Sequence, residues 1–318
     1  MAELVLGIGT SHGPQLGIPP EQWQLLREKD ENDKRMNFQE LASRAQPGIK
    51  EQICEEVWKR KYASCMTALM KLRQILSKTS PDILVVVGDD QHENLLDDNM
   101  PVFCVFRGPA VIAVRRQTTA LPLWAQVEDR TRALPLENYT CNPGLAEHLI
   151  QYLNSHGFDV ASSNKLRPDI GLGHAFRNVY DQIMPEGRFP IVPLMVNTFF
   201  PPNQPSPRRC YALGEALAEA IDAWDNGKKV AIVASGGLSH VIIDEELDRV
   251  TLDALRGADK EALCALPVDK LVHGNSEIRN WIVMAGAVQG LKMSLVDYVP
   301  CYRSVAGTGC AMAFAHWA

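Results

Sequence analysis

The chain has 318 residues, and its 32 Lys and Arg against 38 Asp and Glu give a net charge of −6 and a pI near 5.8. A hydrophobic share of 46% supplies a sizeable core, which excludes a disordered chain and a disulfide-stapled mini-protein. Because the chain has no long basic run, we expect no nucleic-acid partner and no membrane association.

Cysteine usage and the N-terminus predict the compartment. The eight cysteines are scattered and form no CxxC pair, which favours a reducing environment over a secreted disulfide scaffold. The first residues carry Glu3 and an apolar stretch too short for a signal peptide or a membrane span. We therefore expect a soluble, cytoplasmic protein.

Apolar runs alternate with helical patterns along the chain. Runs rich in β-branched residues predict buried strands over residues 3–9, 82–88, 101–106, 189–196 and 229–236. Helical periodicity predicts helices over residues 49–77, 144–155, 208–226 and 278–290. This alternation predicts an α/β fold: a single large domain whose central sheet is mixed, mainly parallel and flanked by helices.

Two segments do not fit this alternation. Residues 19–50 are charged and flanked by prolines, and with the helix after them they predict a helical cap insertion, residues 19–80, after the first strand of a domain spanning residues 1–318. Residues 115–142 are irregular and predict a long surface excursion.

Polar residues follow three of the predicted strands, where an open α/β sheet collects its ligands. His12, His92 and His240 come shortly after strands, and His174 lies in a Gly-rich loop. Each imidazole taken alone is better explained by a structural or surface role, because a loop histidine can simply hydrogen-bond a backbone carbonyl. Their convergence at one sheet edge favours a shared site, with metal-binding and acid–base chemistry both open to imidazole. The other histidines are expected to be structural: His148, His156, His273 and His316.

A metal held by two imidazoles usually takes an anionic third ligand, and two His with one carboxylate mark non-haem Fe(II) oxygenases. The candidate carboxylates are Asp89, Asp90, Glu93 and Glu277. Glu277 has a second interpretation, because an acid just after a Ser276 N-cap complements a helix dipole. Spacing alone does not choose among them.

Several segments, in order along most of the chain, resemble the class III extradiol ring-cleavage dioxygenases. The family member used for the alignment is the β subunit of protocatechuate 4,5-dioxygenase. The resemblance rests on Gly7-Ile8-Gly9-Thr10-Ser11-His12, Asp90-Gln91-His92, Val196-Asn197, Pro201-Pro202, Glu277 and residues 209–214, 235–240 and 281–287. The last stretch, residues 302–310, resembles the single-chain gallate and 3-O-methylgallate dioxygenases more closely.

The resemblance implies a function and a site. It implies an Fe(II) cofactor with His12, His92 and Glu277 as metal ligands and His240 as the catalytic acid/base. It also implies that O2 opens the ring of a catecholic aromatic acid of the 3-O-methylgallate, gallate or protocatechuate type, in the degradation of aromatic and lignin-derived compounds. The predicted helical insertion would then replace the small helical subunit that accompanies some relatives.

One departure from the family pattern concerns His174. Where the family has Asp-His-Gly, this chain reads Asp169-Ile170-Gly171, with His174 four residues after Ile170. Either His174 takes over that catalytic role after a local shift or the role is absent, and we expect the first.

The substrate's acid group needs donors, for which Thr10, Asn197, Tyr302 and Arg303 are the candidates. A zinc-dependent enzyme of the same superfamily, or a zinc hydrolase, is the alternative enzyme, because the same ligand set suits zinc. A non-catalytic scaffold that binds a partner is the alternative from another class. Since dimers are the commonest oligomers, we expect a homodimer.

Overall fold

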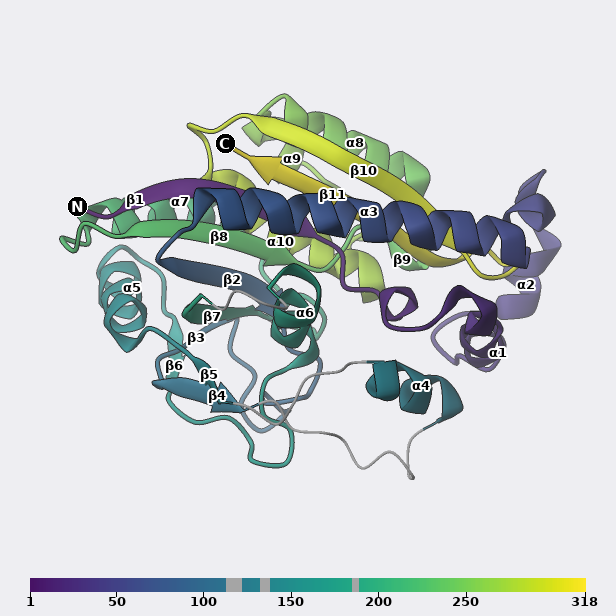
Figure 1. The fold of residues 1–318 in the computed structure, drawn as a ribbon, viewed down its shortest axis with the longest axis horizontal. Helices are drawn as coiled ribbons and strands as arrows, with labels where there is room; N and C mark the ends of the chain where they lie inside the picture. The colour runs from purple at the N-terminus through teal and green to yellow at the C-terminus, as the bar shows by residue number, and fades with distance from the viewer. Residues whose placement is uncertain (113–121, 132–137, 185–188) are drawn as a thin grey trace.

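The computed structural model describes residues 1–112, 122–131, 138–184 and 189–318. Its main sheet has nine strands, of which eight follow the order β10-β11-β1-β8-β2-β7-β3-β6, while β9 pairs with β11 (Figure 1). A second, two-stranded sheet joins β4 (Ala110–Ile112) and β5 (Asn138–Thr140). The predicted α/β fold with a mixed sheet is confirmed.

The centre of the main sheet is parallel. It consists of β1 (Glu3–Thr10), β8 (Lys229–Ser235), β2 (Ile83–Asp89) and β7 (Ile191–Val196). All residues of β2 and β7 are buried, as expected for strands covered on both faces, and this double burial explains their unbroken apolar sequence. The sequence predicted all four of these strands.

Antiparallel pairings extend the sheet on both sides. On one side β11 (Thr308–Trp317) pairs with β1, β10 (Met293–Tyr302) and β9 (His240–Ile242). On the other, β3 (Phe103–Phe106) runs antiparallel to β7 and parallel to β6 (Ala161–Ser163). The sequence predicted β3 but not β10 or β11.

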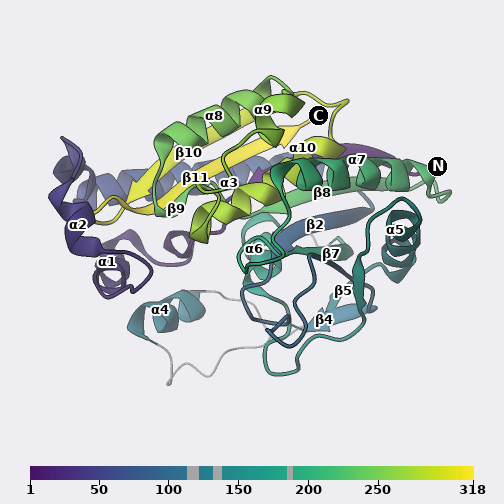
Figure 2. The same ribbon diagram turned by 180° about the vertical axis from the view of Figure 1, so that it is seen from behind.

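Helices cover both faces of the sheet and create two cores (Figure 2). Ile83, Val85 and Val87 of β2 point into one core, while Leu84 and Val86 point into the other, because side chains alternate along a strand. The first core packs against α5 (Pro143–Ser155), α7 (Pro207–Ala223), α8 (Glu245–Arg256), α9 (Lys260–Cys264) and α10 (Ile278–Ala287). The second packs against α3 (Glu55–Thr79) and α6 (His174–Ile183).

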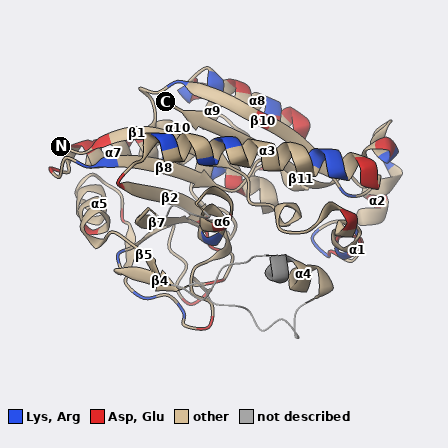
Figure 3. Cartoon of the chain, in the orientation of Figure 1, with Lys and Arg blue, Asp and Glu red and all other residues tan. Residues whose placement is uncertain are grey.

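Charged side chains lie on the outer faces of the helices that cover the sheet. Figure 3 shows Lys, Arg, Asp and Glu of both signs along α3 and α8, where each helix faces outward. The opposite face of α3 buries apolar side chains against the sheet, including Leu69, Leu72 and Leu76. This amphipathic pattern is typical of helices that cover a sheet.

The segment between β1 and β2 is helical, as predicted. It contains η1 (Pro14–Leu16), η2 (Pro20–Gln22), α1 (Gln24–Glu31), α2 (Phe38–Ser43) and η3 (Ile49–Gln52) before α3 begins. The rings of Trp23 and Trp58 lie 6.0 Å apart and join the start of this segment to α3. While α1 and α2 lie beyond the sheet, α3 packs on the sheet itself (Figure 1).

The predicted irregular segment, residues 115–142, falls partly outside the described residues, at positions 115–121 and 132–137. Its described part contains α4 (Leu123–Thr131) and β5. Among the described helices, none has the length and apolar character needed to cross a membrane.

Candidate active site

Three neighbouring parallel strands, β1, β8 and β2, end at one edge of the sheet, and the site lies there. His12 follows β1, Asp89 ends β2, and residues 236–240 follow β8. Two more residues reach the same edge. Glu277 is the last residue of η5 (His273–Glu277), and His174 is the first residue of α6. The meeting of strand-end polar residues follows from their parallel direction.

Four side chains form a cluster that could hold a metal ion: His12, Asp89, His174 and Glu277. Each offers one ligand atom, and these atoms all lie within 4.8 Å of one another. Nε2 of His12 is 3.2 Å from Oε2 of Glu277, and Nε2 of His174 is 3.9 Å from Oδ2 of Asp89. We call this set the ligand cluster.

Glu277 is the hub of the ligand cluster. Its fully buried carboxylate accepts hydrogen bonds from the backbone N–H of Gly237 at 2.9 Å and from Nε2 of Gln91 at 3.2 Å. Burial opposes its ionisation, but the neighbouring imidazoles of His240 and His12 outweigh burial and hold the pKa of Glu277 well below its usual value. Glu277 is therefore a buried carboxylate that stays charged.

The backbone at Gly236 fits closely around this carboxylate. Its φ of +115° favours glycine, and a Cβ atom there would lie 2.4 Å from Oε2 of Glu277 and 3.0 Å from Cε1 of His12. A side chain at position 236 would therefore occupy space used by two members of the ligand cluster.

Asp89 brings a second buried carboxylate to the cluster. Burial and the nearby charge of Glu277 raise the pKa of Asp89 to about 6. Gln91 donates to Oδ2 at 3.1 Å, whereas no donor within the described ranges reaches the buried Oδ1. Since a buried oxygen without a donor is costly, a cation would satisfy it.

His174 is oriented by Glu93. Nδ1 of His174 lies 2.8 Å from Oε2 of Glu93, and the backbone N–H of His174 donates to both oxygens of that carboxylate. Burial opposes protonation, but Glu93, Asp89 and Glu277 together raise the pKa of His174 to about 10. With Nδ1 facing Glu93, Nε2 faces the other members of the ligand cluster.

His240 lies on the far side of Glu277, with Nε2 3.1 Å from Oε1. Its Nδ1 is 2.9 Å from the carbonyl of Leu238, and its backbone N–H donates to Oδ1 of Asn275. Burial lowers the pKa of His240, but the charge of Glu277 and the hydrogen bond to it have the larger effect and raise it.

His92, predicted as a ligand, lies outside the ligand cluster. Its ring stacks on Phe200 with centroids 3.7 Å apart, and its Nε2 is 3.0 Å from Oδ1 of Asp97. Its backbone is left-handed, with a φ of +58°. The structure thus brings His12, His174, His240 and Glu277 together and holds His92 in a neighbouring contact.

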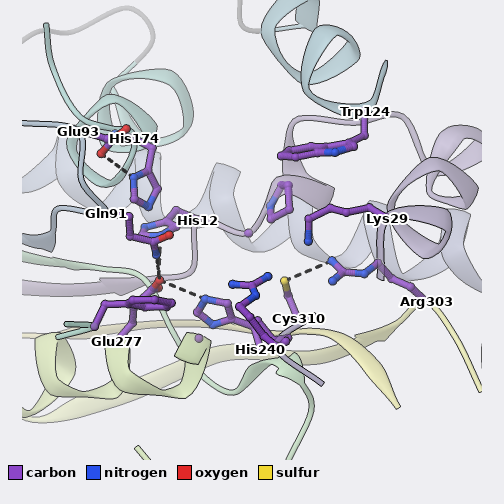
Figure 4. Close-up of a pocket in the computed structure, with 16 residues that line it drawn as sticks. His12, Lys29, Gln91, Glu93, Trp124, His174, His240, Glu277, Arg303 and Cys310 are labelled. Carbon is purple, nitrogen blue, oxygen red and sulfur yellow. Dashed lines mark hydrogen bonds and ion pairs between the residues drawn. The ribbon is translucent and has the colours of Figure 1, made fainter. Parts of the chain in front are cut away.

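A cavity of about 310 Å³ opens onto three members of the ligand cluster and onto His240. Figure 4 shows His12, Gln91, His174, His240 and Glu277 gathered on one side of it and Lys29, Trp124 and Arg303 on the other. The charged and aromatic side chains that line it therefore come from segments far apart in the sequence.

Of the four residues predicted to bind the substrate's acid group, Arg303 lines this cavity. The other three have partners elsewhere in the described structure. The Thr10 hydroxyl donates to the Ser11 carbonyl, the Tyr302 hydroxyl donates to Glu245 at 2.7 Å, and Asn197 holds the turn at residues 200–203.

Sequence reasoning missed Gln91, Lys29, Arg35 and Trp124 as cavity residues, and it weighed Glu93 only as a metal ligand. Gln91 and Glu93 share the segment after β2 with His92, so their position gave a usable signal. Lys29, Arg35 and Trp124 follow no strand, and no local pattern distinguished them from exposed side chains.

Comparison with known proteins supports the family suggested by the sequence. The profile of the catalytic LigB subunit of aromatic ring-opening dioxygenase matches residues 45–312. A 2,3-dihydroxyphenylpropionate/2,3-dihydroxicinnamic acid 1,2-dioxygenase of Azotobacter vinelandii is 27% identical over 179 residues, 54% of this chain and 48% of the relative. A gallate dioxygenase of Pseudomonas putida is 32% identical over 158 residues, 45% of each chain.

The chain thus spans about half the length of the curated relatives it matches. The family match, by contrast, covers most of the chain. It includes three of the four residues of the ligand cluster, Asp89, His174 and Glu277, while His12 lies before its first residue. The chain therefore belongs to the family of the catalytic LigB subunit of aromatic ring-opening dioxygenases.

Proposed function

We propose that this protein is an Fe(II)-dependent extradiol dioxygenase that uses O2 to open the ring of a catecholic aromatic acid of the gallate, 3-O-methylgallate or protocatechuate type. The observation that carries the proposal is the ligand cluster, two imidazoles and two carboxylates within 4.8 Å, beside a third imidazole, that of His240. Family membership and the curated relatives named as dioxygenases support the same reaction.

The ligand cluster fits the metal. Its donor set includes the two His and one carboxylate typical of non-haem Fe(II) oxygenases, and Asp89 adds a buried oxygen without a donor. We propose that His12, His174, Asp89 and Glu277 hold the ion. When bound, Fe(II) would orient the diol and O2 and provide a route for electrons between them.

The surrounding residues would hold these ligands in place. Glu93 fixes the ring of His174, while Gln91 and the Gly237 backbone N–H fix the carboxylate of Glu277. Such contacts keep ligands oriented before a metal arrives. Glu277, which contacts the imidazoles of both His12 and His240, is fully buried, so bulk water does not reach its carboxylate.

His240 is the proposed catalytic acid/base. Nδ1 of His240 lies against the Leu238 carbonyl, so Nε2, which lies 3.1 Å from Oε1 of Glu277, is the ring atom that can hold or release a proton at the cavity. Nε2 can then take a proton from a diol hydroxyl as the catechol binds and later return a proton to the reacting oxygen. His174, which shares the cavity, belongs in this proposal with the metal ligands.

Metal content tests the ligand assignment. His12→Ala and His174→Ala should each reduce the Fe(II) bound per chain, whereas His92→Ala should leave it near the wild-type value. Loss of iron in His92→Ala with retention in His174→Ala would instead favour the ligand set implied by the family resemblance.

Oxygen uptake tests the reaction. Freshly Fe(II)-loaded protein should consume O2 with protocatechuate, gallate or 3-O-methylgallate and form yellow ring-opened products. The alternative is a zinc enzyme, since two His and a carboxylate also suit Zn²⁺. Activity with bound zinc and ester hydrolysis without O2 uptake would favour that alternative.

The cellular setting is part of the same proposal. We propose a cytoplasmic homodimer that acts in the degradation of aromatic, lignin-derived compounds. All eight cysteines are free, which suits a reducing compartment. Size-exclusion chromatography with light scattering would measure the oligomeric state.

A further inference from the structure

The cavity has a cationic wall opposite the ligand cluster. Lys29 of α1, Arg35 of the loop after α1 and Arg303 of the loop after β10 all line it, together with Trp124 of α4 (Figure 4). The first three bring one positive charge each to a cavity whose other end holds the proposed metal site.

The charge of Arg303 is already used within the protein. Its guanidinium forms two hydrogen bonds with Asp30, at 2.7 and 3.1 Å, and a third with Gln15 at 3.2 Å. Arg303 and Asp30 are both buried. A buried, fully engaged pair of this kind is a structural element and has little donor capacity left for a ligand.

Arg35 is held in the same way by Asp33. Its Nε lies 2.9 and 3.1 Å from the two carboxylate oxygens, and its Nη2 reaches Oδ2 at 2.5 Å. The guanidinium of Arg35 and the carboxylate of Asp33 therefore neutralise one another at the cavity wall.

Lys29 differs from both arginines. Its Nζ lies 3.6 Å from a carboxylate oxygen of Asp30 and 3.6 Å from one of Asp33, and both carboxylates already bind an arginine. Among the described residues it donates no hydrogen bond, and its Nζ lies 5.7 Å from the centre of the Trp124 ring. The three cations and the two carboxylates of Asp30 and Asp33 together carry a net charge of one positive unit. Because both arginines are engaged, the N–H donors of this group that remain free within the described structure are those of Lys29.

We propose that Lys29 binds an anionic substituent of the substrate, so that the protein selects catechols carrying a carboxylate over neutral catechols. The inference rests on the proposed function, which fixes the diol at the ligand cluster and thereby directs the rest of the ring toward the opposite wall. The ring of Trp124 offers an apolar surface beside the ammonium. A charge-assisted hydrogen bond from Lys29 would complete the recognition.

The test measures binding of two probes to the Fe(II)-loaded full chain under argon by isothermal titration calorimetry. The probes are 3,4-dihydroxybenzoate and the neutral 4-methylcatechol. We expect Lys29→Met to weaken binding of the acid roughly 10- to 100-fold, which is the range for a lost hydrogen bond to a charged group. Binding of 4-methylcatechol should change by less than about two-fold, which also shows that the variant is folded.

Two further variants serve as controls. Lys29→Arg keeps the charge and should retain most of the preference for the acid. Lys59→Met makes the same substitution at a half-exposed lysine of α3 that pairs with Glu55 and does not line the cavity, so it should bind both probes like the wild type.

The outcomes separate this inference from the proposed function. Equal weakening of both probes by Lys29→Met, or a wild-type protein that binds both probes equally, overturns the inference while ring cleavage still stands. A wild-type protein that neither binds a catechol nor consumes O2 with one overturns the proposed function and the inference with it.

Discussion

Nδ1 of His174 lies 2.8 Å from Oε2 of Glu93, and the same carboxylate accepts the backbone N–H of His174. This double contact fixes both the start of α6 and the orientation of its first ring. Because Nδ1 is occupied, only Nε2 is left to face Asp89 and the rest of the ligand cluster. A carboxylate behind a ligating imidazole is a recurrent way of orienting the ring and raising its basicity.

Removal of Glu93 should therefore weaken metal binding without removing any ligand. We expect Glu93→Ala to lower the affinity for Fe(II) by about 10- to 100-fold, as losses of such supporting contacts do. Competition with a chromophoric chelator measures the affinity. Glu55→Ala, at the exposed start of α3, is the matched control. Unchanged affinity in Glu93→Ala would remove Glu93 from the proposed site.

His240 should be needed for turnover and dispensable for metal retention. We expect His240→Ala to bind iron like the wild type and to lose about 10²- to 10⁴-fold in the rate of O2 uptake, the usual contribution of general acid–base catalysis. Iron analysis and an oxygen electrode measure the two quantities. His156→Ala, at an exposed histidine stacked on Tyr152, should lose neither. Turnover of His240→Ala at the wild-type rate would refute the role.

Gly214 should be needed for the close packing of α7 against α10. A Cβ atom at position 214 would lie 1.9 Å from the carbonyl oxygen of Val283 and 2.8 Å from Cα of Gly286. We expect Gly214→Ala to reduce the free energy of unfolding by about 1–3 kcal/mol, as overpacking does, measured by urea denaturation. Gly290→Ala is the control, because a Cβ atom there meets nothing within 4 Å. Equal stability of the two variants would contradict this packing.

Asp248 should make stability depend on pH. Burial raises its pKa from 3.8 to about 6, despite hydrogen bonds from Ser239 and Tyr298. The folded state therefore binds this proton more tightly than the unfolded state, and stability should fall as the pH rises from about 4 to about 6. The loss is about 3 kcal/mol, from the free energy of a pKa change of this size.

Asp248→Asn removes that ionisation and should flatten this part of the profile. Urea denaturation of the wild type and of Asp248→Asn, at intervals between about pH 4 and pH 7, measures the difference. Parallel profiles for the two proteins would show that Asp248 does not titrate in this range.

The sequence by itself determined the class of fold and the edge of the sheet that carries the site. Buried parallel strands need continuous apolar runs, so β1, β2, β7 and β8 could be predicted from local sequence. The strands β10 and β11 were not predicted. In β11 three of the ten residues are alanines, whose strand propensity is low. The sequence also showed that His12 and His240 follow strand ends, where parallel strands bring their loops together.

Only the tertiary structure decided which of the candidate side chains meet. Glu277 was one of four possible carboxylates, and its choice depends on how α10 packs against the sheet edge. His174 faces the other ligands because it contacts Glu93, whereas His92 stacks on Phe200 instead. The contact between His174 and Glu93 joins residues 81 positions apart. Local propensity carries no information on contacts between such distant residues, because they form only when the whole chain packs.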